Sequence, residues 1–273
     1  MHLLSLQQVW LYGQIEWQRL LFTRRGWLTM LSCALLWFVL LRYLVVPVSI
    51  WMQEPATVLG AEWLAAWVDV RHLLHWPAAE LSIFWVLALL LVPPSAVLFT
   101  AGQICRDRSR GTLRFYSLRS HRVSILLGRF LGQLALLGTL VLFALLATLA
   151  LIGWQQGGIS SAVFSAACYS WLLVMVTLLP FVALMSLMSV LTASSRGAAS
   201  LAIAFLALLP LLVGTLAPYW SESGYLLSLL PGAHIQSLIS TRPWQPGAVV
   251  WLPLLQCLAY LSLSAWYFQR RSL

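Results

Sequence analysis

The chain has 273 residues, of which 61% are hydrophobic and only 8% are charged. Its mean hydropathy is +0.88. Soluble domains carry about 25% charged residues, so this composition excludes an ordinary soluble enzyme or binding domain and predicts an integral membrane protein. The formal net charge is +9, and all sixteen basic residues are arginines.

Residues 1–25 precede the first long apolar segment and have the pattern of an amphipathic helix. At 100° per residue, Trp10 and Trp17 share an apolar arc, while Tyr12 and Glu16 lie on the opposite side. We interpret this segment as an interfacial helix on the cytoplasmic leaflet. The alternative is a soluble helix that packs on a partner.

Six apolar segments are long enough to cross a bilayer. About 20 apolar residues in a helix span a hydrocarbon core of about 30 Å, and continuous apolar runs favour helices over the alternating strands of a barrel. The sequence therefore predicts an all-α integral membrane protein with a single transmembrane domain over residues 1–273. The expected spans are residues 27–50, 82–104, 123–152, 167–192, 198–218 and 248–268.

Two of these spans contain residues that are unusual in a membrane helix. Arg42 lies in the first span, where a charge costs about 2.5 to 3.5 kcal/mol near the helix centre unless it is paired, reaches the headgroups or faces water. It either lines a cavity for an anionic substrate or extends toward the outer headgroups. Pro93 and Pro94 in the second span remove two backbone donors and predict a kink, which fits a hinge or a static bend.

The distribution of arginine predicts the orientation of the chain. Arginines gather before the first span, along the connection 105–122, at the fourth connection and at the C-terminus. By the positive-inside rule, both termini and the 105–122 connection are cytoplasmic. We expect a multi-pass protein of a bacterial-type inner (plasma) membrane, with membrane lipid as a partner and no nucleic acid. Residues 219–246, on the opposite side, contain an apolar run too short to span and are expected to dip into the outer leaflet.

The connection between the second and third spans carries the strongest functional pattern. Gly111 permits a sharp bend, Thr112 can cap a following helix, and apolar and aromatic residues then offer a face for a groove. We predict a short cytoplasmic helix here that a soluble partner can grip, and we call it the coupling helix; a basic loop that only faces lipid is the alternative. The residues expected to contact that partner are Arg106, Asp107, Arg108, Arg110, Gly111, Thr112, Leu113, Phe115, Tyr116 and Arg122.

This connection resembles that of type-2 ABC exporter permeases, the membrane subunits of ABC transporters. The resemblance lies in Asp107 before Gly111-Thr-Leu, then Ser117, Arg122 and the Ile125-Leu-Leu-Gly-Arg segment that opens the third span. It extends to the interfacial helix, the six spans and the outer membrane-dipping segment.

The resemblance implies partners that this chain does not contain. The sequence has no GxxxxGK[ST] phosphate loop, so two copies of a separate ABC ATPase would bind ATP and Mg, and a second permease chain, identical or homologous, would complete the transporter. We expect no catalytic residue, metal site or cofactor in this chain itself. The implied function is ATP-driven export of an amphiphilic, lipid-, glycan- or peptide-like substrate. The alternative is a mechanical transducer that relays ATPase motion to an extracytoplasmic partner without transport. An extracytoplasmic accessory protein is a further partner that the resemblance allows.

Overall fold

The computed structural model describes residues 6–53, 76–105, 107, 111, 121–216, 218–219, 221–240 and 250–270. Within these ranges the secondary structure is helical, and five helices are long and apolar enough to cross a membrane. The all-α prediction is confirmed. Five of the six predicted spans correspond to these helices, so the sixth remains a prediction.

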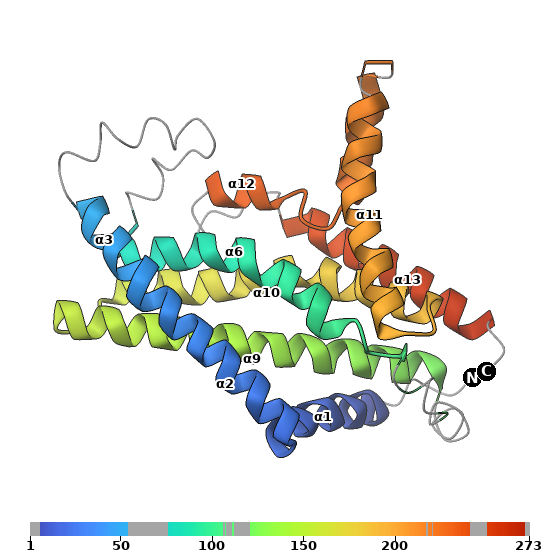
Figure 1. Cartoon of the computed structure of the whole chain (residues 1–273), viewed down its shortest axis with the longest axis horizontal. Helices are drawn as coiled ribbons and strands as arrows, with labels where there is room; N and C mark the ends of the chain where they lie inside the picture. Colours follow the sequence, from blue (N-terminus) through green and yellow to red (C-terminus); the bar gives the residue numbers. More distant parts are fainter. Residues whose placement is uncertain are drawn as a thin grey trace.

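The first described helix is α1 (Leu6–Phe22), which packs against the start of α9. The hydroxyl of Thr23 then accepts a hydrogen bond from the backbone N–H of Gly26 at 3.1 Å and caps the next helix. This helix continues as α2 (Arg24–Leu40), a π-helical turn (Leu41–Val45) and α3 (Val46–Gln53). Figure 1 shows α2 crossing the long helix α9 on its way from α1 to α3.

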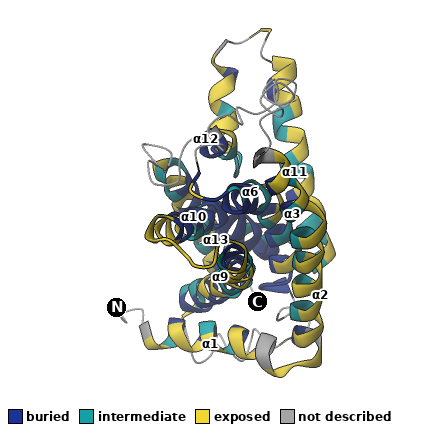
Figure 2. Cartoon of the chain, turned by 90° about the vertical axis from the view of Figure 1, so that its left-hand side faces the viewer, coloured by how far each residue is buried: buried dark blue, intermediate teal, exposed yellow. Residues whose placement is uncertain are grey.

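Four helices form the centre of the bundle. These are α6 (Ala79–Thr100), α9 (Arg122–Gln156), α10 (Ser161–Leu191) and α13 (Trp251–Arg270). The central member is α10, which contacts the other three and α11 (Ser195–Leu216). In the most apolar stretch of α10, 78% of the residues are buried. The corresponding fraction is 11% in α11 and also 11% in the helical segment Gly26–Trp51, which contains α2. Figure 2 shows the same contrast, with α2 mainly exposed beside a buried centre.

The predicted outer segment, 219–246, is partly described. It contains a 3₁₀-helix, η3 (Ser221–Leu229), and a short helix, α12 (Ile235–Ser240). Two side chains of α13 satisfy backbone groups at the end of η3: the amide of Gln256 donates to the carbonyls of Ser228 (2.5 Å) and Leu230 (3.0 Å), and the Tyr260 hydroxyl donates to Leu229. Unpaired backbone carbonyls are costly in an apolar environment, so these bonds stabilise the short helix against α13.

The sixth predicted span corresponds in position to α13, although α13 is not among the five helices selected by length and composition. Gln256 and Tyr260 account for part of this difference, because these polar residues lower the mean hydropathy of α13. The sequence-based boundary at residue 248 lies three positions before the first residue of α13, Trp251.

Candidate functional site

Glycines allow α1 and α9 to approach each other closely. A Cβ atom added at Gly128 would lie 2.5 Å from the Cβ of Tyr12 and 2.8 Å from the carbonyl oxygen of Val9. One added at Gly132 would lie 2.9 Å from the Cβ of Glu16. Such distances are shorter than normal contacts, so only glycine fits at these two positions of α9. The Gly-x-x-x-Gly spacing places both on one helix face.

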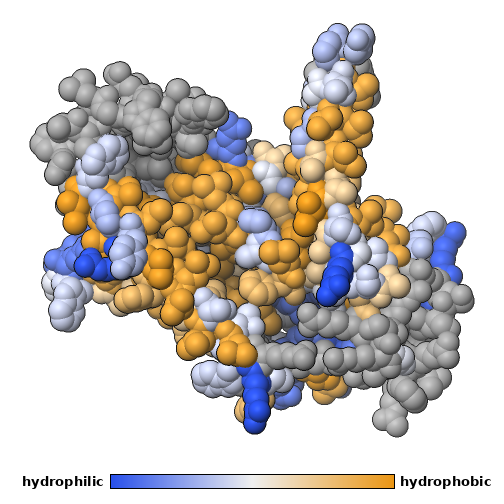
Figure 3. Space-filling view, viewed as in Figure 1, coloured by the Kyte–Doolittle hydropathy of each residue, from blue (hydrophilic) through white to orange (hydrophobic). Residues whose placement is uncertain are grey.

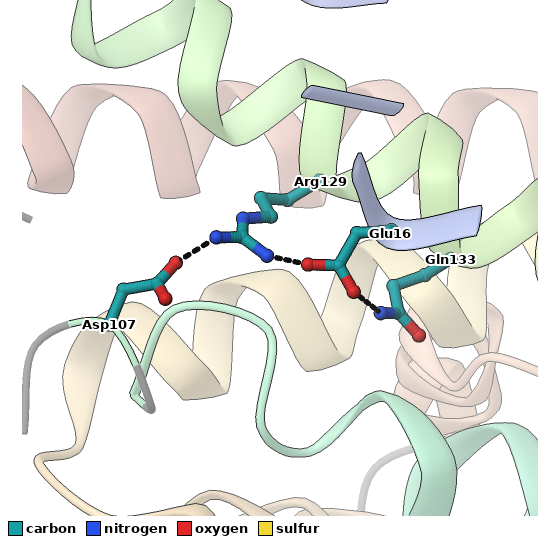
Figure 4. Close-up of polar contacts among 4 residues, drawn as sticks. All are labelled: Glu16, Asp107, Arg129 and Gln133. Atoms are coloured by element: carbon teal, nitrogen blue, oxygen red, sulfur yellow. Dashed lines mark hydrogen bonds and ion pairs between the residues drawn. The ribbon is translucent and has the colours of Figure 1, made fainter. Parts of the chain in front are cut away.

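This close contact brings the carboxylate of Glu16 to the side chain of Arg129. The Arg129 guanidinium forms ion pairs with Glu16 of α1 and with Asp107, which follows α6 in the chain. The amide of Gln133 donates a hydrogen bond to the other carboxylate oxygen of Glu16 at 3.0 Å. We call Glu16, Asp107, Arg129 and Gln133 the Arg129 cluster. Figure 4 shows its side chains in one chain of contacts, with Arg129 between the two acidic residues.

The Arg129 cluster is withdrawn from solvent. Arg129 is 2% exposed, Asp107 is 3% exposed and Glu16 is 7% exposed. Removing one member of a buried ion pair typically costs about 3 to 5 kcal/mol, because the remaining charge is left uncompensated. The planar guanidinium suits this site, since it can direct separate N–H groups to two carboxylates.

The cluster joins three parts of the chain that are distant in sequence. Glu16 belongs to the first helix, Asp107 lies at the start of the predicted coupling segment, and Arg129 lies in the second turn of α9. Packed interiors resist compression, so the two ion pairs of Arg129 tie Asp107, α1 and α9 together at one buried point.

Comparison with protein families identifies a relationship that covers most of the chain. The matching family model is described as an ABC-2 family transporter protein, and it covers residues 13–273. The chain belongs to this family. A comparison with curated proteins gives no match. The family and the apolar helices together indicate a multi-pass membrane permease subunit of an ABC transporter, and they imply partnership with an ABC ATPase.

In this ABC-2 family permease the two ends of the sequence motif meet in the fold. Asp107 precedes the Gly-Thr-Leu segment and Arg129 ends the Leu-Gly-Arg segment, and the two form one of the buried ion pairs. The intervening Gly111 has φ of +69°, and a Cβ atom added there would meet no described atom within 4 Å. A positive φ favours glycine over other residues, in agreement with the predicted bend.

The other predicted coupling residues have different placements. Arg122 is half-buried, and its Nη1 donates hydrogen bonds to the carbonyls of Phe268 (3.1 Å) and Gln269 (3.4 Å) at the end of α13. The remaining members lie outside the described residues, so their predicted contacts with an ATPase stay predictions. These are Arg106, Arg108, Arg110, Thr112, Leu113, Phe115 and Tyr116.

The structure separates the candidate cavity and hinge residues. Arg42 is exposed and lies in the π-helical turn between α2 and α3. Pro93 is buried and Pro94 is exposed, and α6 continues through both as one helix. Figure 1 shows the path of α6 bending toward its C-terminal end. A bend agrees with the expected effect of proline, and a hinge function remains a prediction.

The place of Glu16 in the Arg129 cluster of this ABC-2 family permease was not evident from the sequence. Glu16 lies opposite the Trp10 and Trp17 face, a position that is ordinary for a polar residue of an amphipathic helix. The structure buries this polar side against α9 and leaves Trp10 and Trp17 exposed, at 69% and 42%. A usable signal was present in the sequence, because Glu16 is one of only seven acidic residues and Arg129 lies inside an apolar helix that favours pairing of its charge.

Proposed function

We propose that this chain is the permease subunit that couples ATP hydrolysis on a separate ATPase to export of an amphiphilic substrate. The observation that carries the proposal is the pairing of Asp107, at the start of the coupling segment, with Arg129 of α9. Two ATPase copies would grip the coupling segments of two permease chains. ATP-driven closure would then displace each segment and move α1 and α9 through the Arg129 cluster.

The substrate class follows from the family resemblance and the apolar character of the spanning helices. An amphiphile with a lipid, glycan or peptide component fits a path along such helices better than a small ion does. The arginine distribution supports a cytoplasmic position for both termini and the coupling segment, which is the side where ATP is available.

Coupling is tested by changing the backbone at Gly111 while leaving the Arg129 cluster intact. Proline has φ near −65° and cannot adopt the +69° of Gly111, whereas asparagine tolerates a left-handed conformation. The permease and its ATPase are purified together in lipid discs. We expect Gly111→Pro to abolish the effect of the permease on ATPase turnover, and Gly111→Asn to retain most of it. Equal turnover in both variants and the wild type would refute coupling through this segment.

Transport is tested separately from coupling. Sealed vesicles that contain the complex are supplied with ATP and a labelled amphiphile, and the transfer of label across the membrane is measured. A complex whose ATPase responds to Gly111→Pro but transfers no lipid, glycan or peptide probe would favour the mechanical-transducer alternative. Transfer that stops in Gly111→Pro and persists in Gly111→Asn would support the export function.

A further inference from the structure

Two apolar grooves run along α2. The larger, of about 580 Å³, lies between α2 and α9 and is lined by residues that include Trp27, Leu31, Phe38, Phe143 and Ala147. The smaller, of about 260 Å³, lies between α2, α6 and α9. Both grooves are bordered by Cys33, Trp37, Leu140 and Ala144, so they meet along the same stretch of α2. Figure 3 shows that the face crossed by α2 is mainly hydrophobic.

The grooves exist because α2 is attached to the bundle at few points. In the last turn of α2, the indole of Trp37 donates a hydrogen bond to the carbonyl of Ala144 at 2.9 Å and packs edge-on against Phe84, with ring centroids 5.5 Å apart. On both sides of this attachment, small residues such as Ala34 and Ala147 leave space between the helices. Protein interiors are normally close-packed, so such space between spanning helices calls for another apolar occupant.

The length of the larger groove matches an acyl chain. It follows α2 and the start of the π-helical turn from Trp27 to Leu41, a separation of 14 positions and about 21 Å at a rise of about 1.5 Å per residue. One leaflet of a bilayer contributes about half of a hydrocarbon core of about 30 Å. The groove therefore accommodates a chain that extends through the hydrocarbon of a whole leaflet.

Arg42 supplies an anion-binding group at one end of the grooves. It directly follows Leu41 and lies four residues after Phe38, and both of these line the larger groove. Arg42 is exposed in a spanning region, within the π-helical turn Leu41–Val45. Turns of this kind occur frequently at functional sites. A phosphate group would stabilise the guanidinium through charge-assisted hydrogen bonds.

We propose that these grooves bind a resident anionic phospholipid, with acyl chains along α2 and the phosphate at Arg42. Apolar surface, chain-length match and charge complementarity all favour this occupant. The site is distinct from the Arg129 cluster and does not depend on the proposed transport function, because a resident lipid remains bound whether or not the ATPase turns over.

Retention of lipid is measured by native mass spectrometry on the full chain, purified in detergent and titrated with phosphatidylglycerol or phosphatidylcholine of identical acyl chains. We expect the wild type to retain phosphatidylglycerol preferentially. Arg42→Gln should lower this retention about tenfold, the effect of losing roughly one strong charged contact. Arg24→Gln, at the opposite end of α2, serves as the charge-matched control and should change retention little.

Filling the larger groove tests the position of the acyl chain. Ala147→Trp places a bulky side chain in the groove, whereas Ala150→Trp adds the same bulk at an exposed position of α9 outside its lining. We expect only Ala147→Trp to reduce lipid retention. Equal retention in both variants, or a loss of dimer in Ala147→Trp with lipid retention unchanged, would overturn the proposal. The second result would make this face an interface between copies.

Cys33 provides a readout that does not depend on lipid surviving purification. It borders both grooves, while Cys168 of α10 is exposed elsewhere. Added phosphatidylglycerol should slow N-ethylmaleimide modification of Cys33 severalfold in the wild type but not in Arg42→Gln, with modification of Cys168 unchanged in both. The proposal would be refuted if phosphatidylcholine slowed the modification of Cys33 as much as phosphatidylglycerol does. It would also be refuted if phosphatidylglycerol had the same effect in Arg42→Gln as in the wild type. Either result would show that the grooves hold bulk lipid without selecting a headgroup.

Discussion

The guanidinium of Arg122 lies against the carbonyl oxygen of Phe268, with 3.1 Å between Nη1 and the oxygen. The first residue of α9 therefore binds the last turn of α13, 146 positions away in the chain. A cation at this position satisfies carbonyls that have no partner within their own helix and complements the negative end of the helix dipole. The bond holds the end of α13 beside the end of the predicted coupling segment.

Replacing Arg122 by glutamine should destabilise this end of the bundle. A charged donor at a helix C-terminus contributes about 1 to 2 kcal/mol, and glutamine is too short and lacks the charge. Thermal unfolding in detergent, followed by near-ultraviolet circular dichroism, measures the loss. The control is Arg196→Gln, which removes an arginine at the start of α11 and should leave the midpoint nearly unchanged. Equal midpoints for both variants would contradict a stabilising role for Arg122.

Adding a single methyl group at Gly128 should separate α1 from α9. The Cβ of Gly128→Ala would meet the Tyr12 Cβ at 2.5 Å and the backbone of Val9 at 2.8 Å. Backbone atoms cannot rotate away, so the helices must move apart at a cost of about 1 to 3 kcal/mol. Gly214→Ala is the matched control, because its Cβ meets nothing within 4 Å in α11 and alanine favours helix by about 1 kcal/mol. In unfolding experiments we expect Gly128→Ala to lower the stability of the protein and Gly214→Ala to raise it. A change of the same sign in both variants would argue against this contact.

Removing the amide of Gln256 should loosen the outer 3₁₀-helix. Gln256→Leu removes one donor from the carbonyls of Ser228 and Leu230, and a typical hydrogen bond contributes about 0.5 to 1.5 kcal/mol. The Leu230 carbonyl still accepts from the backbone N–H of Ala233 at 3.1 Å, so we expect local loosening of the segment. Hydrogen exchange of residues 221–230 should become faster while α10 stays protected. Ser262→Ala removes a hydroxyl from the exposed side of the same helix and should leave exchange of this segment unchanged. Protection that persists in Gln256→Leu would show that other contacts fix η3.

Acidification should weaken the outer segment through His234. Burial lowers the pKa of His234 from 6.5 to about 4, and neither ring nitrogen has a hydrogen-bond partner among the described residues. The unfolded chain therefore binds a proton first, so stability is full above pH 6.5 and falls as the pH is lowered toward 4. His234→Leu should remove this contribution to the pH dependence. Thermal midpoints from about pH 7 to about pH 4 check it, and parallel curves for both proteins would disprove the assignment.

The sequence predicts the spanning helices well because their signal is local. Long apolar runs identify α6, α9, α10 and α11. The bounds differ from expectation mainly at the helix ends, because adding or removing one turn there changes the mean hydropathy of the run very little. The Arg129 cluster is different. Its bond between Glu16 and Gln133 joins residues 117 positions apart, and this partnership depends on how closely two helices pack.

The same distinction explains why the functions of Gln256 and Tyr260 were not evident. Each is an isolated polar residue in an apolar helix, and its partners are carbonyls of η3 that any sequence would supply. By contrast, the predicted bend at Gly111 rests on the conformational preference of one residue type. Its φ of +69° therefore agrees with a prediction that needed no knowledge of distant contacts.

The extensive contact between α10 and α13 has a consequence for biosynthesis. The most buried of the long apolar helices is completed by the last described helix of the chain to leave the ribosome. Until α13 is made, the side of α10 that it covers has no partner from this helix, and η3 lacks the donors of Gln256 and Tyr260. Translation that stops before residue 250 would thus yield a protein whose earlier helices are complete but whose central helix α10 lacks its most extensive partner.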